Sequence, residues 1–512
     1  MADTHQGPSA SNDSKQPSPV NRLKLLAEQS PLKYLVLTPI EKNHTDKDYI
    51  RLSMVFPVGF TKEESNGLSR RLAHEAREVF ERTLTHWPFL NGTFGRKMIE
   101  GQSRLVLWYK QPVTQRDVID RFIEDTSWLM KAAPECQDIS TLPLKLFEFD
   151  KNIDKHTEPK KIATYLGDPN YPVMVRVKLL DEGVFVIRFA FSERIFDMQF
   201  VQNYLRQFLD FTLLENSVKN IQPLDVRRTM PKIEDRDRLI SIPTEKSRLG
   251  YMIYRLKEKY VRATFDPLVG EPMSGQVMPT GFSSCIFAYM WYRITQARWE
   301  TGVIEHNHIT TAFIKYPAHH SIRAKAYYGN STYTAAFTAQ VDELTDCMLE
   351  EEGTGKKKTD EQLLELERKR KMREKFLLGC AVGILSVDPV DRDLLQKFYG
   401  VKQSVSPEED DEASSRALLT QYDVVFENWI DCGYARARYI RAFFGGNDVY
   451  PYFMPCVDHM EEGKVILLPP WGKGRKISND ISHDDGWDVC VCLQREELNE
   501  LERALRKDEA IR

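Results

Sequence analysis

The hydrophobic pattern is clearest between residues 173 and 211, where two apolar runs precede a helical repeat. Val173–Leu180 and Val184–Phe191 are rich in β-branched and aromatic residues, and a short polar segment separates them. Such runs predict a hairpin whose second strand is buried. Apolar residues then recur at helical spacing, at Phe200, Val201, Leu205, Phe208, Leu209 and Phe211. The pattern therefore predicts a strand, a tight turn that carries Glu193, and a helix that begins at Asp197, a rigid frame of the kind that holds functional side chains.

Similar patterns elsewhere predict a mixed α/β protein. Strands are expected at Lys33–Leu37, Ile50–Phe56, Arg104–Tyr109, Lys464–Leu468 and Trp487–Leu493. Helices are expected after the capping box of Thr61 and Glu64, at Val118–Met130, at Ser247–Val261, and at the end of the chain, where Leu498, Leu501 and Leu505 share one face.

Composition divides the chain into parts. Residues 1–30 are too polar to offset their own ordering entropy, so we expect them to be disordered. Residues 216–245 contain prolines and many charges, which is typical of a linker. We therefore expect an N-terminal domain over 31–215, a crossover over 216–245 and a C-terminal domain over 246–512.

Charge and cysteine usage narrow the class of protein. The 512 residues carry a formal net charge of -4, which gives no reason to expect nucleic acid as a partner. The sequence has no apolar run of the ~20 residues that span a bilayer and no signal-peptide core, so we expect a cytoplasmic protein without a membrane span. The eight cysteines include no CxxC pair, and HExxH is absent, so we expect no metal site. Cys490 and Cys492 should share one face of a strand.

Several short motifs occur in an order that resembles the BAHD acyltransferases and their fungal relatives, such as the trichothecene 3-O-acetyltransferase group. The segment from Ser192 to Asp197 lies where that family has HHxxxD. The other matching segments are Pro88-Phe89-Leu90-Asn91-Gly92-Thr93, Ser283 to Trp291 with Ala297-Arg298, Tyr327-Tyr328-Gly329-Asn330, and Asp431-Cys432-Gly433-Tyr434-Ala435. The resemblance covers residues 33 to 512.

This resemblance implies a fold of two chloramphenicol acetyltransferase-like α/β domains with mixed, mostly antiparallel sheets and a channel between them. It also implies acyl-CoA as co-substrate, a small natural product of specialised (secondary) metabolism as acceptor, and a monomer. The residues that match structural positions of the family are Trp291, Asn330, Asp431, Gly433 and Tyr434. Cys432 stands in place of a phenylalanine, which would widen the neighbouring cavity. With Ser192, Phe189 and Phe191, it is a candidate for contact with the substrate.

The sequence departs from the family at the catalytic position. In the family the second histidine of HHxxxD is the general base, whereas here Ser192 and Glu193 occupy the two histidine positions and Asp197 matches the structural aspartate. An ordinary glutamate has a pKa about two units below that of imidazole, which costs ~3 kcal/mol of driving force toward an alcohol. Phe189 and Phe191 lie on the same strand face, and apolar surroundings of this kind would narrow the gap.

Three functional readings follow from this substitution. In the first, Glu193 replaces the histidine as base in acyl transfer to a hydroxyl or amine. In the second, the cavity catalyses a cyclisation, isomerisation or dehydration of a polyketide or terpenoid without CoA. In the third, Glu193 is an ordinary turn residue of an inactive binding protein. His319 and His320 are candidates for a relocated base or for substrate contacts, and Arg323 is a candidate ion-pair partner for Asp197.

Overall fold

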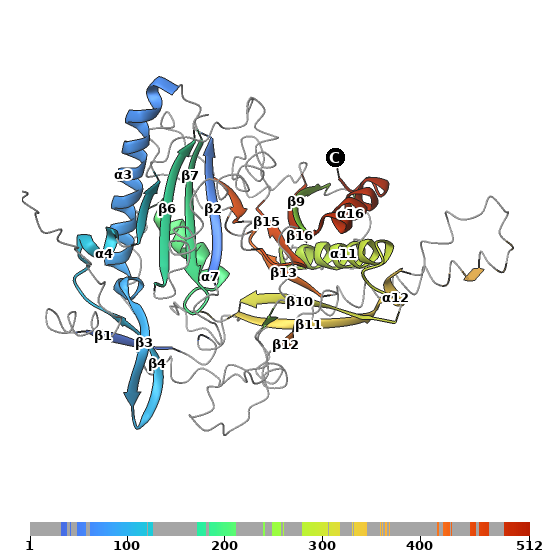
Figure 1. Cartoon of the computed structure of the whole chain (residues 1–512), viewed down its shortest axis with the longest axis horizontal. Coiled ribbons are helices and arrows are strands. Elements are labelled where there is room, and N and C mark those ends of the chain that lie inside the picture. The colour runs from blue at the N-terminus through green and yellow to red at the C-terminus, as the bar shows by residue number, and fades with distance from the viewer. Residues whose placement is uncertain are drawn as a thin grey trace, which may run out of the picture.

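The computed structural model describes residues 32–37, 41, 49–57, 62–119, 121–125, 171–180, 184–210, 239–240, 248–257, 260, 279–305, 307–317, 330, 332–345, 359, 361, 364–365, 368, 417–418, 423–430, 432, 451–456, 460–469 and 486–511. The predicted disordered segment 1–30 and nearly all of the predicted crossover 216–245 lie outside these residues. Figure 1 shows the described strands in two large groups, which we call the first half and the second half of the structure, because the earlier and the later part of the chain supply most of their strands.

The first half contains a small and a large sheet. The small sheet has the order β1(Lys33–Val36), β4(Gln102–Tyr109), β3(Thr93–Ile99). The large sheet has the order β14(Tyr452–Pro455), β2(Tyr49–Pro57), β7(Val184–Ser192), β6(Val173–Leu180), β5(Phe122–Asp125). The helical segments of this half are α3(Lys62–His86), η1(Pro88–Asn91), α4(Gln115–Ile119) and α7(Met198–Leu209).

The second half is built on a six-stranded sheet. Its order is β11(Thr332–Gln340), β10(Ile309–Pro317), β13(Val424–Asn428), β15(Lys464–Leu468), β16(Trp487–Gln494), β9(Leu249–Leu256). The helices are α11(Pro279–Glu300), α12(Val341–Thr345) and α16(Arg495–Lys507), and the short strands β8(Leu239–Ile240) and β12(Ala417–Leu418) pair with each other. No described helix is long and apolar enough to cross a bilayer.

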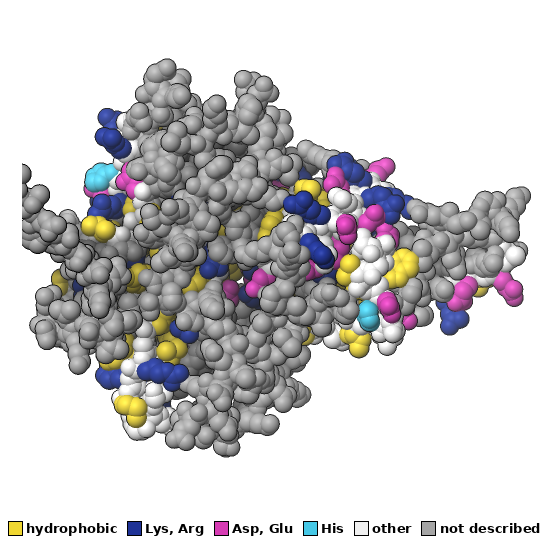
Figure 2. Space-filling view, in the orientation of Figure 1, with side chains coloured by type: hydrophobic (Ala, Val, Ile, Leu, Met, Phe, Trp, Pro, Cys, Tyr) yellow, Lys and Arg dark blue, Asp and Glu magenta, His cyan; other side chains and the backbone are white. Residues whose placement is uncertain are grey.

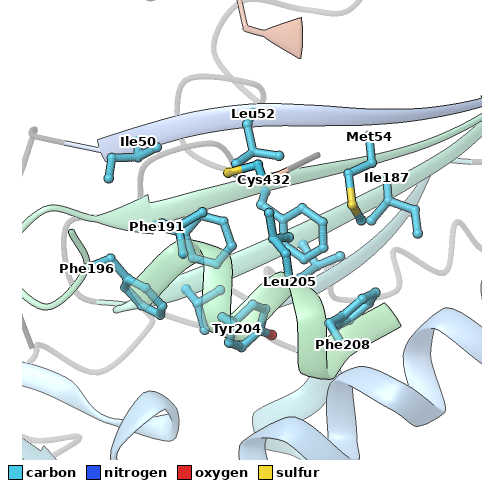
Figure 3. Close-up of a cluster of buried hydrophobic side chains, with 14 of the residues drawn as sticks. Ile50, Leu52, Met54, Ile187, Phe191, Phe196, Tyr204, Leu205, Phe208 and Cys432 are labelled. Atoms are coloured by element: carbon cyan, nitrogen blue, oxygen red, sulfur yellow. The ribbon is translucent and has the colours of Figure 1, made fainter. Parts of the chain in front are cut away.

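The core of the first half lies between the large sheet and helices α3 and α7. Strands β6 and β7 form the predicted hairpin, with Val175 opposite Phe189. Alternation along β7 directs Phe189 and Phe191 toward α7, where they contact Tyr204. Figure 3 shows Phe191, Tyr204 and Phe208 packed together in this layer. The aromatic core therefore fixes the strand and the helix on either side of the turn that carries Glu193.

The two faces of the six-stranded sheet meet different surroundings. One face belongs to the same hydrophobic cluster as helices α11 and α16, and its strand residues are Ala312, Ile314, Val424, Phe426, Val465, Leu467, Val489 and Val491. The opposite face contributes Ile466, Leu468, Cys490 and Cys492 to the core of the first half. The predicted common face of Cys490 and Cys492 is thus confirmed, and this second face is where the two halves meet.

Helix α11 is the central helix of the second half. Every side chain from Ser283 to Arg298 is buried, and the Trp291 Nε1 donates to Thr310 Oγ1 on β10 at 3.2 Å. Helix α16 has a polar outer face, on which Arg503 lies 3.0 Å from Glu300 and Arg506 lies 2.7 Å from Glu502. Figure 2 shows acidic and basic side chains interspersed on the part of the second half that carries α16.

Two predicted helices are wrong. Of the segment predicted as a helix over Ser247–Val261, residues Leu249–Leu256 form strand β9, because pairing with β16 buries apolar side chains on both of its faces. Such a run has no polar face from which its period can be judged. Of the helix predicted over Val118–Met130, helix α4 ends at Ile119, and the parallel pairing of β5 with β6 makes Phe122–Asp125 a strand.

One strand crosses the domain division expected from the sequence. Strand β14 comes from residues 452–455, yet it pairs with β2 in the large sheet of the first half, with Phe453 opposite Met54. The two halves are therefore joined by main-chain hydrogen bonds as well as by side-chain packing.

Gly463 occupies a position where a side chain does not fit. It has a φ of +79°, and a Cβ there would lie 2.4 Å from the carbonyl oxygen of Asp423. We expect Gly463→Ala to lower the unfolding free energy by about 3 kcal/mol, because the strained φ and the clash add. Gly302 has a similar φ of +73° with nothing near its Cβ position, so Gly302→Ala is the matched control and should cost about 1 kcal/mol. Equal losses in urea unfolding of the two variants would show that the clash relaxes freely.

Candidate active site

The turn between β7 and α7 is fixed by its own backbone. The carbonyl oxygen of Ser192 accepts hydrogen bonds from the amides of Ile195 at 3.0 Å and Phe196 at 2.9 Å. Asp197 then caps α7, with its Oδ1 accepting from the amide of Phe200 at 2.7 Å. Phe191 and Phe196, on either side of the turn, are buried. Glu193 and Arg194 are the partly exposed side chains of the turn.

Asp197 has a structural role that can be measured. We expect Asp197→Ala to lower the unfolding free energy by about 1–2 kcal/mol, because the first turn of α7 loses its side-chain acceptor. Asp197→Asn keeps a capping oxygen and should lose less. Thermal unfolding followed by circular dichroism tests both variants. An equal loss in Asp197→Asn would show that the negative charge matters more than the cap.

Glu193 lies at the junction of the two halves. Its carboxylate oxygens are 3.4 and 3.5 Å from the Nζ of Lys315, which comes from β10. The amide Nδ2 of Asn330 donates to the carbonyl oxygen of Glu193 at 2.5 Å, and the Asn330 Oδ1 accepts from the amide of Thr332 at 2.7 Å. Asn330 is buried, so the second half holds both the backbone and the side chain of Glu193.

Lys315 also contacts a second carboxylate, so negative and positive side chains alternate from Glu193 to Lys464. Its Nζ lies 2.9 Å from Glu427 Oε1 on β13, and Lys464 Nζ on β15 lies 3.0 Å from the same oxygen. Trp429 Nε1 donates to the other oxygen, Glu427 Oε2, at 3.2 Å. We call the four charged residues Glu193, Lys315, Glu427 and Lys464 the junction cluster.

The members of the junction cluster differ in the exposed fraction of their side chains. The Glu427 side chain is 4% exposed, whereas Glu193 is 14% and Lys315 is 26% exposed. Burial by itself would raise the pKa of the Glu427 carboxyl, but Lys315 and Lys464 more than offset this, and the pKa stands below its ordinary value. A lowered carboxyl pKa stabilises the fold above the ordinary range near 4.5, and the stabilisation is lost as pH falls through the lowered value. Glu427 is therefore the fixed, ionised interior end of the cluster.

The other residues expected near the substrate lie in the core beneath the turn. Phe189 and Phe191 are fully buried and stack on each other with ring centroids 5.2 Å apart. Ser192 is also fully buried, and its Oγ has no hydrogen-bond partner among the described residues. Cys432 is buried in the same hydrophobic cluster as Leu52, and Figure 3 labels both residues.

Some expected site residues cannot be placed in this geometry. His319, His320, Arg323, Asp431, Gly433 and Tyr434 lie outside the described residues. In the described part of the chain, no group of three or more His, Cys, Asp or Glu side chains is placed to hold a metal ion. The site visible in the structure is thus a cluster of carboxylates and ammonium groups.

Sequence reasoning missed Lys315, Glu427 and Lys464. A signal was present, because Glu427 directly follows the apolar run Val424–Phe426 and Lys464 directly precedes the run Val465–Leu468, so each charge adjoins an apolar strand. Strands β10, β13 and β15 are parallel neighbours, and their register brings the three charges to one face of the sheet. That register joins residues more than 100 positions apart, from 315 to 427, and no local pattern encodes it.

The chain is similar to known proteins in structure and not in sequence. No family model matches the chain, and no curated protein matches it in sequence. The structure is similar to TRI101 of F. sporotrichioides complexed with coenzyme A and T-2, at a TM-score of 0.56 and 12% identity over 93% of this chain and 99% of that one. It is similar to TRI101 of F. graminearum complexed with coenzyme A and deoxynivalenol, at a TM-score of 0.54 and 14% identity over 92% and 97%.

A third similar structure is that of vinorine synthase. Its TM-score is 0.53 at 12% identity, and the match covers 94% of each chain. Identities this low carry information about the fold alone, but the matches extend over nearly the whole of both chains. The chain therefore has the chloramphenicol acetyltransferase-like, BAHD-type fold that the sequence resemblance implied, a mixed α/β architecture of two halves that meet at the junction cluster.

Proposed function

We propose that the protein is an acyl-CoA-dependent transferase of specialised metabolism, which acylates a hydroxyl or amine of a small natural product with Glu193 as the base. The observation that carries the proposal is the placement of Glu193. A rigid turn of the first half presents a partly exposed carboxylate at the junction, and the second half fixes it through Lys315 and Asn330.

The residues at the junction have separate roles in the proposed reaction. Glu193 accepts the proton of the acceptor nucleophile, and its carboxylate lies 3.4 Å from the Lys315 ammonium group. Asn330 holds the backbone of the turn, so the carboxylate keeps one direction relative to both halves. The acyl-CoA supplies the activated thioester that the nucleophile attacks, and Lys315 holds the Glu193 carboxylate from the second half.

The similar structures support the choice of co-substrate. Two of them contain coenzyme A together with T-2 or deoxynivalenol. By analogy of fold, we propose that this chain also takes a CoA thioester and a natural product, and that it works as a cytoplasmic monomer of fungal type.

Calorimetric titration with acetyl-CoA and longer acyl-CoAs tests the proposal. We expect binding in the micromolar range, because the fold is shared with proteins that bind CoA. The Glu193→Gln variant should bind acyl-CoA as well as the original protein does, since the amide keeps the size of the side chain and can still accept a hydrogen bond from Lys315. Absence of heat at millimolar acyl-CoA would overturn acyl transfer.

A second candidate function is a CoA-independent cyclisation, isomerisation or dehydration of a polyketide or terpenoid. The contact between Glu193 and Lys315 favours it, because an ion-paired carboxylate is a weaker base than imidazole and suits abstraction of an acidic carbon-bound proton or support of a cation. Chemistry without acyl-CoA that depends on Glu193 would support this candidate. If no turnover is found with or without acyl-CoA, and substitution of Glu193 has no effect, the protein is instead a binding protein.

A further inference from the structure

We infer that Lys315 is a positioning residue of the proposed reaction, which favours the ionised form of the Glu193 carboxylate, and that the buried Glu427 acts on Glu193 through Lys315. This inference rests on the proposed function and deepens it, because it names the groups that set the pH range in which Glu193 can act as a base. It is carried by one ammonium group that the junction cluster shares between two carboxylates.

The Lys315 ammonium group lies between the turn of the first half and the sheet of the second half. Its Nζ is 2.9 Å from Glu427 Oε1 on β13 and 3.4 Å from Glu193 Oε2 on the turn. The shorter contact is the one with the buried carboxylate, so Glu427 fixes the place of the ammonium group. Glu193 therefore meets a positive charge that the second half already holds in position.

The place of this ammonium group affects how readily Glu193 binds a proton. An opposite charge within about 4–6 Å of a carboxyl lowers its pKa by about 1–3 pH units. Removal of the Lys315 charge should therefore raise the pKa of Glu193, whatever its value in the original protein. A general base works only in its ionised form, so a raised pKa would move the acid limb of the pH–rate profile to higher pH.

Glu427 should have the opposite effect on Glu193. Burial and the charge of Glu193 raise the pKa of the Glu427 carboxyl, and Lys315 and Lys464 lower it by more. The repulsion between the two carboxylates is mutual, so the Glu427 charge also raises the pKa of Glu193. Glu427→Gln removes this charge and a competitor for the Lys315 ammonium group. The pKa of Glu193 should then fall.

Two further charged groups belong to the turn of Glu193 itself. Arg194 follows it directly, and Asp197 is the N-cap of α7. Asn330, which approaches from the second half, is uncharged and donates to the main chain of Glu193. All three stay in place when Lys315 is substituted, so their effects cancel in a comparison of variants.

Lys464 provides the matched control within the junction cluster. Its Nζ lies 3.0 Å from the same Glu427 oxygen that Lys315 contacts, and its side chain is 22% exposed against 26% for Lys315. Among the described residues, the ion pair of Lys464 is with Glu427 and not with Glu193. Loss of the Lys464 charge thus disturbs Glu427 as much as loss of Lys315 does, without removing the partner of Glu193.

The experiment titrates the Glu193 carboxyl in the full-length protein without any substrate. Glutamate labelled with carbon-13 at Cδ reports protonation by NMR, and the Glu193 signal is identified by its absence from Glu193→Gln. We expect Lys315→Met to raise the pKa by at least about one pH unit and Lys464→Met to raise it by less than half as much. Lys315→Arg, which keeps the positive charge, should leave the pKa close to the original value. Glu427→Gln should lower it.

Each outcome decides a separate part of the inference. Equal shifts in Lys315→Met and Lys464→Met would overturn the role of Lys315, and a raised or unchanged pKa in Glu427→Gln would overturn the role of Glu427. Circular dichroism checks the fold of each variant, and Lys315→Gln replaces Lys315→Met if the latter does not fold. Absence of acetyl-CoA binding would overturn the proposed function alone. Acetyl-CoA binding together with an unshifted Glu193 titration in Lys315→Met would overturn this inference alone.

Discussion

Glu193→Gln is expected to lower turnover of the acceptor by about 10²–10⁴-fold, the usual contribution of a general base. Glutamine has the size of glutamate and can accept a hydrogen bond from Lys315, so the junction keeps its geometry. Glutamine cannot take the proton from the acceptor nucleophile. The loss should therefore appear in kcat, and acetyl-CoA affinity should stay the same.

The stability of this variant provides an internal control. The Glu193–Lys315 pair is partly exposed, so its loss should cost no more than ~1 kcal/mol of unfolding free energy. The Glu305→Gln variant, with its side chain in solvent, controls for the substitution itself. If the Glu193→Gln variant keeps full turnover, Glu193 is not the base. If the variant instead loses much of its thermal stability, the main role of the carboxylate is to join the two halves.

The turn and its flanks are predictable because their signals are local. The polar residues between Val184–Phe191 and the helical repeat are adjacent in sequence, and the structure places β7, the turn and α7 as expected. The predicted hairpin, the strands at Lys464–Leu468 and Trp487–Leu493, and the last helix are confirmed for the same reason. Strand β9 does not show a strand pattern in the sequence, because apolar side chains on both of its faces pack into a core.

The environment of Glu193 was not predictable from local patterns. The sequence predicts apolar surroundings for Glu193, formed by Phe189 and Phe191. In the structure these rings point into the core against α7. The neighbours of its carboxylate come from β10 and, through Lys315, from β13. Only the parallel register of β10, β13 and β15 places these charges together, and that register depends on long-range packing.

A second group of buried charges, outside the junction, tests how the second half is held together. Arg298 on α11 and Glu497 on α16 are almost fully buried, with Arg298 Nε 3.7 Å from Glu497 Oε2. Arg298 Nη1 also donates to the carbonyl oxygen of Asp423 at 3.1 Å, and Glu497 accepts from the amide of Gln494 as part of a capping box. These contacts tie α11 to α16 and to the start of β13.

Arg298→Met should therefore be strongly destabilising. Methionine fills much of the space, but it leaves the Glu497 carboxylate buried without its positive partner. Breaking a buried ion pair in this way costs about 3–5 kcal/mol. Urea unfolding at pH 7.5 should show a loss of this size. The double variant Arg298→Met/Glu497→Gln keeps the capping oxygen and has no buried charge, so it should recover most of the loss.

The pH dependence distinguishes the charge from the packing. Burial already raises the pKa of Glu497 above its ordinary value, and removal of Arg298 takes away the main group that lowers it. A raised carboxyl pKa means that the folded protein binds more protons than the unfolded chain above about pH 4.5, so stability falls as pH rises through the folded-state pKa. Arg298→Met should thus lose more stability at pH 8 than at pH 5, and the double variant should show little such difference. Equal losses at both pH values without rescue would assign the effect to packing and to the hydrogen bond with Asp423.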